Sequence, residues 1–345
     1  MEKNILSISE PIVYSYKHHG LPLSIIQYNE NTKFWILSRY INLYAVPNFD
    51  DVHWLDYFSQ HLFSFHSPWI FPQRITKNTL LNVFGKIGFS EFVINCIDSG
   101  QYVYIEYDAY YIPHHSSFKR IHHISNLLVF GYDKGNNLFN ILDYDYNNNM
   151  RFCEMQVKFA DLADAYYNMD APEYNAISVL SVSGADAQFT PDMSLIKQRL
   201  EGYLEGTDYL SNYRVAMNFH HGNSKGRVFG INIYDLLEEY IDSTNKGNSK
   251  LYIQPFSTLW EHKRVLQLLG ESIIELDGNG EDSKLLSNSL QKMERMAMII
   301  RNLCLKQKIS KSVYFVNKIK SHLQELREYE RSTLFDLINL LGKRI

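Results

Sequence analysis

Cysteine is scarce in this 345-residue sequence, and the three that occur, Cys96, Cys153 and Cys304, lie far apart. A disulfide framework or a structural zinc site would need closer pairs, so neither is predicted. Long apolar runs are also lacking. No stretch of about 18 consecutive apolar residues occurs, so we expect no transmembrane helix and no membrane partner. The first residues lack the continuous apolar core and small-residue cleavage site of a secretory signal, and we therefore expect a cytoplasmic protein.

The sequence has no long run of lysine and arginine, and its formal net charge is -4. Nothing in this distribution favours a nucleic-acid partner. Two pairs of adjacent histidines, His114-His115 and His122-His123, could suggest a metal site. Adjacent residues of an extended segment point to opposite faces, however, so each pair supplies at most one ligand. We therefore predict no metal and no tightly bound cofactor.

Apolar and aromatic side chains, in contrast, are abundant. Hydrophobic residues make up 45% of the chain and aromatic residues 14%, which suffices for two domains that each have a core. Strand patterns dominate the first half and helical periodicity the second, with a small polar segment at 183–192 between them. We predict an α+β protein with a first domain at 1–185 and a helical-bundle domain at 186–345.

The expected elements follow from apolar periodicity and capping residues. A helix is predicted at Thr32–Tyr44, where Thr32 or Asn31 could cap the first turn. Shorter helices are expected at 78–88 and 159–167, and strands at 102–107, 127–130, 138–142, 152–157 and 175–183. The helices of the second domain are predicted at 193–204, 233–242, 257–275, 283–307 and 310–341, with Ser283 and Ser310 as N-caps. In the last helix, leucines at three-four spacing are interrupted by Glu330, a pattern that favours an antiparallel bundle.

The most informative stretch runs from Gly100 to Asp145. It contains three aromatic-rich strand candidates, with histidines just before the second and carboxylates at the end of the third. This order of strand, His, strand and Asp is how papain-type cysteine hydrolases and acyltransferases supply two members of their catalytic triad. The stretch therefore raises the question of where a nucleophile lies.

Four motifs carry a resemblance to a known family: Tyr107-Asp-Ala-Tyr-Tyr-Ile-Pro113, His122-His123, Leu127-Leu-Val-Phe-Gly-Tyr-Asp133 and Leu142-Asp143. Together they resemble the N-terminal domain of the butirosin-biosynthesis protein H family, over about residues 10–185. The resemblance implies a papain-like fold, related to bacteriocin-processing cysteine peptidases, in which an N-terminal helix packs on an antiparallel sheet. The member for which the family is named moves an acyl group from a carrier-protein thioester to an amine. The helical second half is similar to an extension that other members carry.

The resemblance also implies a set of site residues. Papain-like chemistry needs a nucleophile at a helix N-terminus, a His oriented by an acid, and an oxyanion donor. Thr32 stands where the family has Cys, Gln27 stands at the oxyanion position, and Asp143 is the orienting acid. The family's base lies about six residues before the Gly of Gly-Tyr-Asp, which is Ser125 here. His123 lies two residues earlier on the same strand face and is the alternative base.

Two functional hypotheses follow, because a Thr hydroxyl is a poor nucleophile beside a thiol. The first is an acyl or peptidyl transferase, or amide-forming enzyme, of natural-product biosynthesis, in which His123 acts as a base without a covalent intermediate. The second is a catalytically inactive pseudoenzyme that acts as a binding partner or scaffold in the same pathway. A peptidase is a third option. The expected partner is an acyl- or peptidyl-carrier protein or a synthetase module, whose phosphopantetheine arm would carry the substrate.

Overall fold

The computed structural model describes residues 2–27, 29–58, 67–86, 88–146, 151–170, 176–183, 189–208, 226–277 and 280–343. The chain divides into two compact units. Unit 1 comprises Met1–Asn31 and Phe63–Ala187, and unit 2 comprises Thr32–Leu62 and Gln188–Ile345. The predicted mixed α+β class, with antiparallel strands and a helical C-terminal region, is confirmed.

The segment Thr32–Leu62 belongs to unit 2, whereas the sequence-based boundary at 185/186 assigned it to the first domain. Hydrogen bonds within unit 2 explain this difference. Arg199 Nη1 donates to the carbonyl oxygen of Ser38 at 2.8 Å, and the Tyr57 hydroxyl donates to the carbonyl oxygen of Thr258 at 3.2 Å. No local pattern in the sequence links these distant positions.

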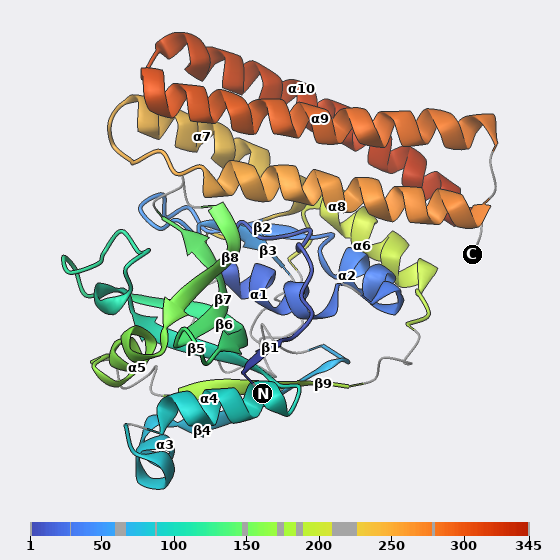
Figure 1. Cartoon of the computed structure of the whole chain (residues 1–345). Helices are drawn as coiled ribbons and strands as arrows, with labels where there is room; N and C mark the ends of the chain where they lie inside the picture. Colours follow the sequence, from blue (N-terminus) through green and yellow to red (C-terminus); the bar gives the residue numbers. More distant parts are fainter. Residues whose placement is uncertain are drawn as a thin grey trace. The chain divides into compact units, whose positions relative to one another are not determined.

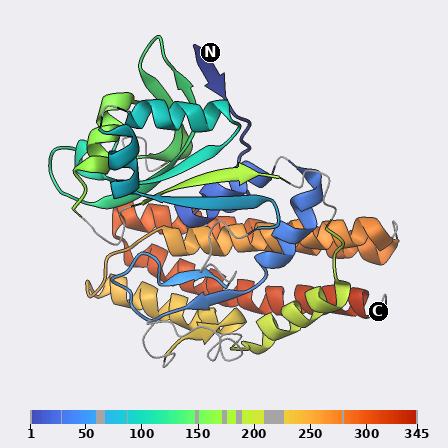
Figure 2. The same cartoon turned by 90° about the horizontal axis from the view of Figure 1, so that it is seen from below.

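Unit 1 is built around a seven-stranded sheet in which every pair of neighbouring strands is antiparallel (Figure 1). The order across the sheet is β4 (Ile70–Thr76), β9 (Ala176–Val182), β5 (Tyr102–Asp108), β6 (Ile124–Asp133), β7 (Leu138–Asp145) and β8 (Arg151–Lys158). A short strand, β1 (Lys3–Ile5), also pairs with β6. Figure 2 shows β4 and β9 side by side at one edge, where Pro72 of β4 has no amide hydrogen to donate.

Strand β6 lies inside the sheet and is buried along most of its length. Its first part pairs with β5 and β7, and its last residues pair with β7 and β1. A Cβ atom on Gly131 would lie only 2.8 Å from the carbonyl oxygen of Asn4, so glycine allows β1 to approach this closely. In the turn that follows, Asn137 adopts a left-handed φ of 55°, which asparagine tolerates.

Among its described residues, unit 1 also contains the α-helices α1 (Lys17–Ile26), α3 (Lys77–Phe84), α4 (Phe89–Asp98) and α5 (Phe159–Tyr167). Helices α4 and α5 bury an apolar face in the same core as the sheet. That core includes Phe89, Val93, Val103, Ile105, Leu127, Val129, Ile141, Leu162 and Tyr166. Burial of each large apolar side chain favours folding by about 1.5–3 kcal/mol, so this face fixes both helices to the sheet.

No described helix is by itself long and apolar enough to cross a bilayer. Helices α3 and α4 satisfy the length and composition criteria only when taken together, and they are bent by 99° relative to each other. Because α4 buries Phe92, Val93 and Ile97 in the core of unit 1, its apolar composition has an explanation inside the fold.

Unit 2 is mostly helical, with α2 (Lys33–Arg39), α6 (Met193–Glu205), α7 (Ile233–Asn245), α8 (Gln254–Asp277), α9 (Glu281–Ser310) and α10 (Val313–Gly342). A three-stranded antiparallel sheet joins β10 (Val228–Phe229), β2 (Leu43–Ala45) and β3 (Leu55–Tyr57). Each of the helices α8, α9 and α10 runs antiparallel to the one before it, so α8 and α10 point in the same direction (Figure 1). The leucine stripe of α10 is buried as predicted, and it includes Leu323, Leu326, Leu334 and Leu337.

Several element boundaries differ from the sequence-based expectation. The helix predicted at Thr32–Tyr44 ends at Arg39, and Leu43–Ala45 forms strand β2 instead. The N-cap of α9 is Gly280 rather than Ser283. The N-cap of α10 is Ser312, whose Oγ accepts a hydrogen bond from the Tyr314 amide at 3.3 Å, while Ser310 ends the preceding helix.

Candidate functional site

Helix α1 begins with a lysine that lies in a buried polar cluster. Lys17 is the first residue of α1, and the first turn of this helix contains no acidic residue. The partial positive charge at a helix N-terminus disfavours a cation there. The buried position of Lys17 therefore requires a nearby negative charge, and Asp143 in β7 supplies it through an ion pair.

All three hydrogens of the Lys17 ammonium have acceptors. Besides the Asp143 carboxylate, Nζ donates to Ser125 Oγ at 2.8 Å and to the carbonyl oxygen of Asn126 at 2.9 Å. The rings of Tyr107, Tyr144 and Tyr146 lie 5.6–5.8 Å from Nζ, where their faces attract a cation. This arrangement is complete for a protonated lysine and holds its side chain in one position.

Asp143 is fully buried and accepts several hydrogen bonds. The Tyr107 hydroxyl donates to Oδ2 at 2.6 Å, the Tyr144 amide donates to Oδ1 at 2.6 Å, and His114 Nε2 lies 3.2 Å from Oδ2. Burial alone would raise the pKa of Asp143, but the charges of Lys17 and His114 outweigh it and lower the pKa below its usual value. Burial lowers the pKa of Lys17, and Asp143 opposes that shift. The geometry therefore stabilises an ionised pair.

His115 lies beside this cluster and is almost completely buried. Its Nδ1 accepts a hydrogen bond from the Ser117 amide at 3.1 Å, so Nε2 carries the ring hydrogen. That Nε2–H group is buried and has no hydrogen-bond partner among the described residues. Burial, and next the charge of Lys17, lowers the pKa of His115 to about 4. The ring, 3.9 Å from that of Tyr146, is therefore neutral near pH 7.

Asn126, the residue after Ser125 in β6, has an unsatisfied side-chain atom. Its main-chain oxygen accepts from Lys17, but its side-chain Oδ1 is buried without a hydrogen-bond partner among the described residues. An unpaired buried polar atom costs about 1–3 kcal/mol. The unpaired donor on His115 lies beside the Lys17 cluster, whereas the Asn126 side chain points to the opposite face of β6 from that of Ser125.

The sequence predicted Ser125 and Asp143, and the fold brings both to Lys17. Strand β6 supplies Ser125, which pairs across the ladder with Tyr107 of β5, and β7 supplies Asp143. His123, just before β6, is exposed, and its backbone amide donates to Asp108 Oδ1 at 3.2 Å. The histidine that contacts Asp143 is His114, not His123.

The other two predicted residues have different surroundings. Gln27 follows the last residue of α1, where its Oε1 accepts from the Ile12 amide at 2.8 Å and its Nε2 donates to the carbonyl oxygen of Glu10 at 2.9 Å. Both polar atoms of the Gln27 side chain are therefore bonded to the segment that precedes α1. Thr32 belongs to unit 2, where it precedes α2, is 1% exposed and makes no side-chain capping bond.

Sequence reasoning missed Lys17, His114 and Tyr107 as members of this cluster. Helix α1 was not predicted because Gly20 and Pro22 interrupt its helical pattern, and Pro22 lies inside the helix. Because this helix was not predicted, Lys17 could not be placed near strands β6 and β7. The sequence did contain a signal for Tyr107. Strands β5, β6 and β7 were expected, and Tyr107 of β5 pairs with Ser125 of β6.

The three cysteines do not provide an activated thiol. Burial raises the pKa of Cys96 to about 11 and that of Cys304 well above its usual value. Cys153 of β8 lies opposite Asp143 in the ladder, and burial followed by the charge of Asp145 raises the pKa of its thiol as well. Thiols with raised pKa values are protonated near pH 7 and react slowly as nucleophiles.

Unit 2 contains a second buried lysine cluster. Lys263 of α8 forms an ion pair with Glu330 of α10, and both side chains are completely buried. Lys263 Nζ also bonds to the Tyr203 hydroxyl at 3.1 Å and to His262 Nδ1 at 2.9 Å, while the Tyr234 hydroxyl donates to Glu330 Oε2 at 2.7 Å.

The tautomer of His262 follows from these contacts. Nδ1 accepts from the Lys263 ammonium, so Nε2 carries the hydrogen that bonds to the carbonyl oxygen of Ile41 at 2.7 Å. Burial, and next the charge of Lys263, holds the pKa of His262 well below its usual value. The cluster thus connects α6, α7, α8, α10 and the segment after α2, and Lys263 has three acceptors.

No protein-family model matches the sequence, and no curated protein is significantly similar to it.

Proposed function

We propose that unit 1 is a papain-like domain that has lost its covalent chemistry. In this proposal the protein is a non-catalytic binding component of a biosynthetic pathway that uses carrier-bound thioesters. The observation that carries the proposal is the Lys17 ammonium, which is buried at the N-terminus of α1 and paired with Asp143. Its support from the sequence is the resemblance over about residues 10–185, together with the order of helix, strand and strand.

The chemistry of the cluster argues against a covalent intermediate. A papain-like site needs a thiol at the helix N-terminus and an imidazole on the strand. In this proposal Lys17 takes the place of the thiol and Ser125 that of the imidazole, instead of Thr32, which the sequence suggested as the nucleophile but which belongs to unit 2. A protonated ammonium has no lone pair with which to attack a thioester. The Ser125 hydroxyl accepts a hydrogen bond from Lys17 at 2.8 Å, and a neutral hydroxyl is far too weak a base to replace an imidazole.

Acyl transfer through His123 has less support than the binding function. That hypothesis needs His123 to be oriented by Asp143 while it takes a proton from an incoming amine. Asp143 is instead bonded to Lys17, Tyr107 and His114. The exposed His123 ring therefore lacks the carboxylate that would fix its tautomer and orientation.

One observation favours a second candidate, in which Ser125 is the nucleophile and Lys17 the base. Serine–lysine hydrolases use a neutral lysine within hydrogen-bond reach of the serine, and here the two atoms are 2.8 Å apart. Burial lowers the pKa of Lys17, which assists this role. The Asp143 carboxylate favours the protonated form and opposes it. The binding proposal is therefore preferred, and the two candidates differ in their response to Ser125→Ala.

The first experiment measures turnover. The full-length protein is incubated with acyl-pantetheine thioesters and an amine acceptor, and amide product and acylated protein are followed by mass spectrometry. We expect neither product above the background without protein. Acyl transfer that is lost in Ser125→Ala would establish the serine–lysine candidate, and transfer lost in His123→Ala would establish the His123 mechanism. Either result would overturn the proposed loss of chemistry.

The second experiment measures binding. Isothermal titration with a non-hydrolysable acyl-pantetheine analogue, free and attached to a carrier domain, should show saturable binding without turnover. Lys17→Met should weaken it, whereas Lys158→Met, which changes an exposed lysine at the end of β8, should not. If neither form of the analogue binds, the proposed partner class is wrong.

A restoration variant tests the papain-like assignment. In Lys17→Cys/Ser125→His, a thiol at the start of α1 would face an imidazole on β6. The new thiol should react with iodoacetamide faster than Cys96, Cys153 and Cys304, whose pKa values are raised. An equally slow reaction in a variant that still folds would argue against this ancestry of the cluster.

A further inference from the structure

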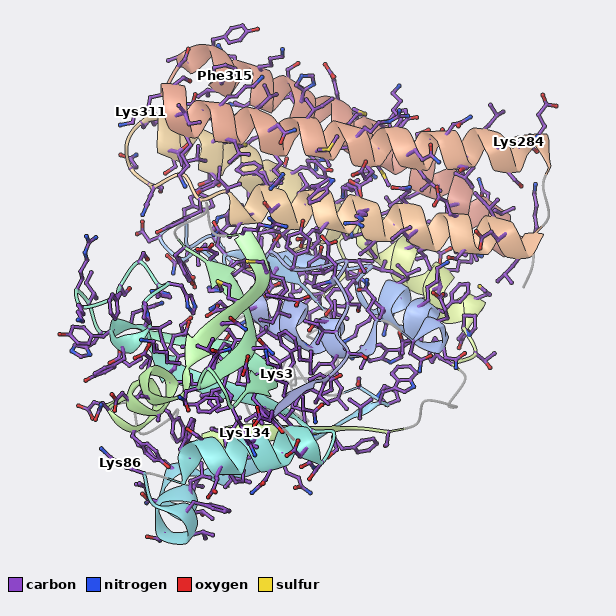
Figure 3. All side chains as sticks on the ribbon, in the orientation of Figure 1. Lys3, Lys86, Lys134, Lys284, Lys311 and Phe315 are labelled. Atoms are coloured by element: carbon purple, nitrogen blue, oxygen red, sulfur yellow. The ribbon has the colours of Figure 1, made fainter. Side chains whose placement is uncertain are left out.

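The turn between α9 and α10 exposes three large apolar or aromatic side chains. Two 30-residue helices meet there through Lys311 and Ser312, and Lys311 has a left-handed φ of 53°. Ile309 is 86% exposed, Val313 57% and Tyr314 63%. We call Lys306, Lys308, Ile309, Lys311, Val313 and Tyr314 the hairpin tip. Figure 3 labels Lys311 and Phe315 at this end of the helices and Lys284 at the opposite end of α9.

The hairpin that carries this tip has charge of a single sign. From Arg295 to Gln324 the sequence contains seven lysines and arginines and no aspartate or glutamate, although the whole chain has a net charge of -4. The loop that follows α7 adds two exposed lysines, Lys246 and Lys250. That loop lies at the same end of the bundle, because Lys320 of α10 bonds to Asp242 in the last turns of α7 at 2.8 Å.

Only part of this positive charge is neutralised within the protein. Lys320 is paired with Asp242, and Arg301 donates to Ser257 Oγ at 3.0 Å and stacks over Trp260. The three lysines of the hairpin tip, Lys306, Lys308 and Lys311, are exposed and form no ion pair among the described residues. Their mutual repulsion is relieved only by salt or by an external anion.

The opposite end of α9 differs in charge. Leu285 is 62% exposed there, but its neighbours are Glu281, Asp282 and Lys284, so both signs are present. An isolated exposed leucine among mixed charges is ordinary for a protein surface. The hairpin tip instead combines clustered apolar side chains with cations alone. This composition is typical of a surface that binds an anionic, partly apolar partner.

We infer that the hairpin tip docks on an anionic lipid bilayer, a peripheral membrane partner that the sequence-based expectation, drawn only from the lack of a long apolar run, did not include. Ile309, Val313 and Tyr314 enter the headgroup region, and Lys306, Lys308 and Lys311 bind lipid phosphates and carboxylates. The tip is a convex turn between two helices, which suits a soft surface. A specific protein interface needs about 800 Å² on each partner, more than these few side chains supply. Nucleic acid would use the lysines but would leave Ile309 and Val313 exposed to water.

The test is vesicle co-sedimentation of the full-length protein. Wild type should sediment with vesicles that contain phosphatidylserine, should remain in solution with phosphatidylcholine vesicles, and should be released by salt. Each lysine removed from the tip should reduce the partition coefficient about five-fold. The charge variant Lys306→Gln/Lys308→Gln/Lys311→Gln and the apolar variant Ile309→Ser/Val313→Ser/Tyr314→Ser should therefore both lose binding.

The matched control is Lys284→Gln/Leu285→Ser at the other end of α9, which should sediment like wild type. Circular dichroism establishes that each variant retains its helices. The inference is overturned if wild type fails to bind phosphatidylserine vesicles, as expected if the natural partner is an acidic protein or a nucleic acid. It is also overturned if both tip variants, still folded, bind as tightly as the control.

Discussion

Lys17 in unit 1 and Lys263 in unit 2 are both buried lysines paired with a carboxylate, but their surroundings differ. Lys263 and Glu330 are bonded to two tyrosine hydroxyls and a neutral imidazole, with partners from four helices. The Lys17 cluster lies where strands β6 and β7 meet the start of α1, and His115 beside it has a buried Nε2 with no hydrogen-bond partner among the described residues. The Lys263 cluster is therefore fully bonded, whereas the Lys17 cluster has an unpaired donor beside it.

The largest expected effect comes from removing one charge of the fully bonded Lys263 cluster. Lys263→Met leaves the Glu330 carboxylate uncompensated in the bundle, which should lower the free energy of unfolding of unit 2 by about 3–5 kcal/mol. Equilibrium urea unfolding measures this change, and hydrogen exchange assigns it to α8 and α10. The double variant Lys263→Met/Glu330→Leu should recover most of the loss. A double variant no more stable than the single one would show that the charges themselves hold the helices together.

The same change at the Lys17 cluster should cost less. Lys17→Met leaves Asp143 with the Tyr107 hydroxyl, the Tyr144 amide and His114, so we expect a loss of about 2–3 kcal/mol in unit 1. Hydrogen exchange in β6 and β7 reports this loss. Lys158→Met, the exposed control on β8, should change stability by no more than about 0.5 kcal/mol. If Lys17→Met and Lys263→Met cost the same, the proposed contrast between the clusters is incorrect.

Removing one tyrosine hydroxyl from each cluster tests the same difference between the two clusters. Tyr234→Phe deletes a donor to Glu330, and Tyr107→Phe deletes the equivalent donor to Asp143. A hydrogen bond to a charged group contributes about 1.5–3 kcal/mol, and the remaining donors to Asp143 should place Tyr107→Phe near the lower limit and Tyr234→Phe above it. Thermal unfolding of both variants in one buffer measures the order, and the reverse order would count against the contrast.

The last expected effect depends on pH and is absent near neutrality. Burial and Lys17 lower the pKa of His115 to about 4, so the unfolded chain binds a proton at this residue between about pH 6.5 and 4 and the folded chain does not. The contribution of His115 to the stability of unit 1 should therefore be complete above pH 6.5 and fall as the pH drops toward 4, by at most about 1.4 kcal/mol per pH unit and roughly 3 kcal/mol by pH 4. Unfolding curves across this range should show a shallower slope for His115→Gln, and an unchanged slope would contradict the assignment.

Much of the fold follows from local sequence patterns. The strands from Tyr102 to Asp145 and the buried stripe of α10 have strong periodicity, which local sequence is sufficient to reveal. Helix α1 was missed because Gly20 and Pro22 are poor helix formers that tertiary packing overrides. Gly20 has a specific packing role, since a Cβ there would lie 3.0 Å from the Phe152 ring.

The composition of the two clusters was less predictable than the strands. Asp143 and Ser125 were found because the resemblance fixed their strands, but Lys17 lies 108 residues from Ser125. Glu330 was visible only as an interruption of a leucine stripe, because its partner Lys263 is 67 residues away in the sequence. Pairings of this kind depend on how helices and strands meet in space, and no short-range periodicity encodes them.

Pro72 in β4 has a consequence for the protein in concentrated solution. Strand β4 pairs only with β9 among the described residues, so its other side is an open edge onto which another chain could add a strand. Pro72 cannot donate a backbone hydrogen bond. On β8, at the other edge, the exposed side chains include Arg151, Glu154 and Lys158. Both edges thus resist templated polymerisation, and the folded chain should withstand growth into amyloid-like fibrils.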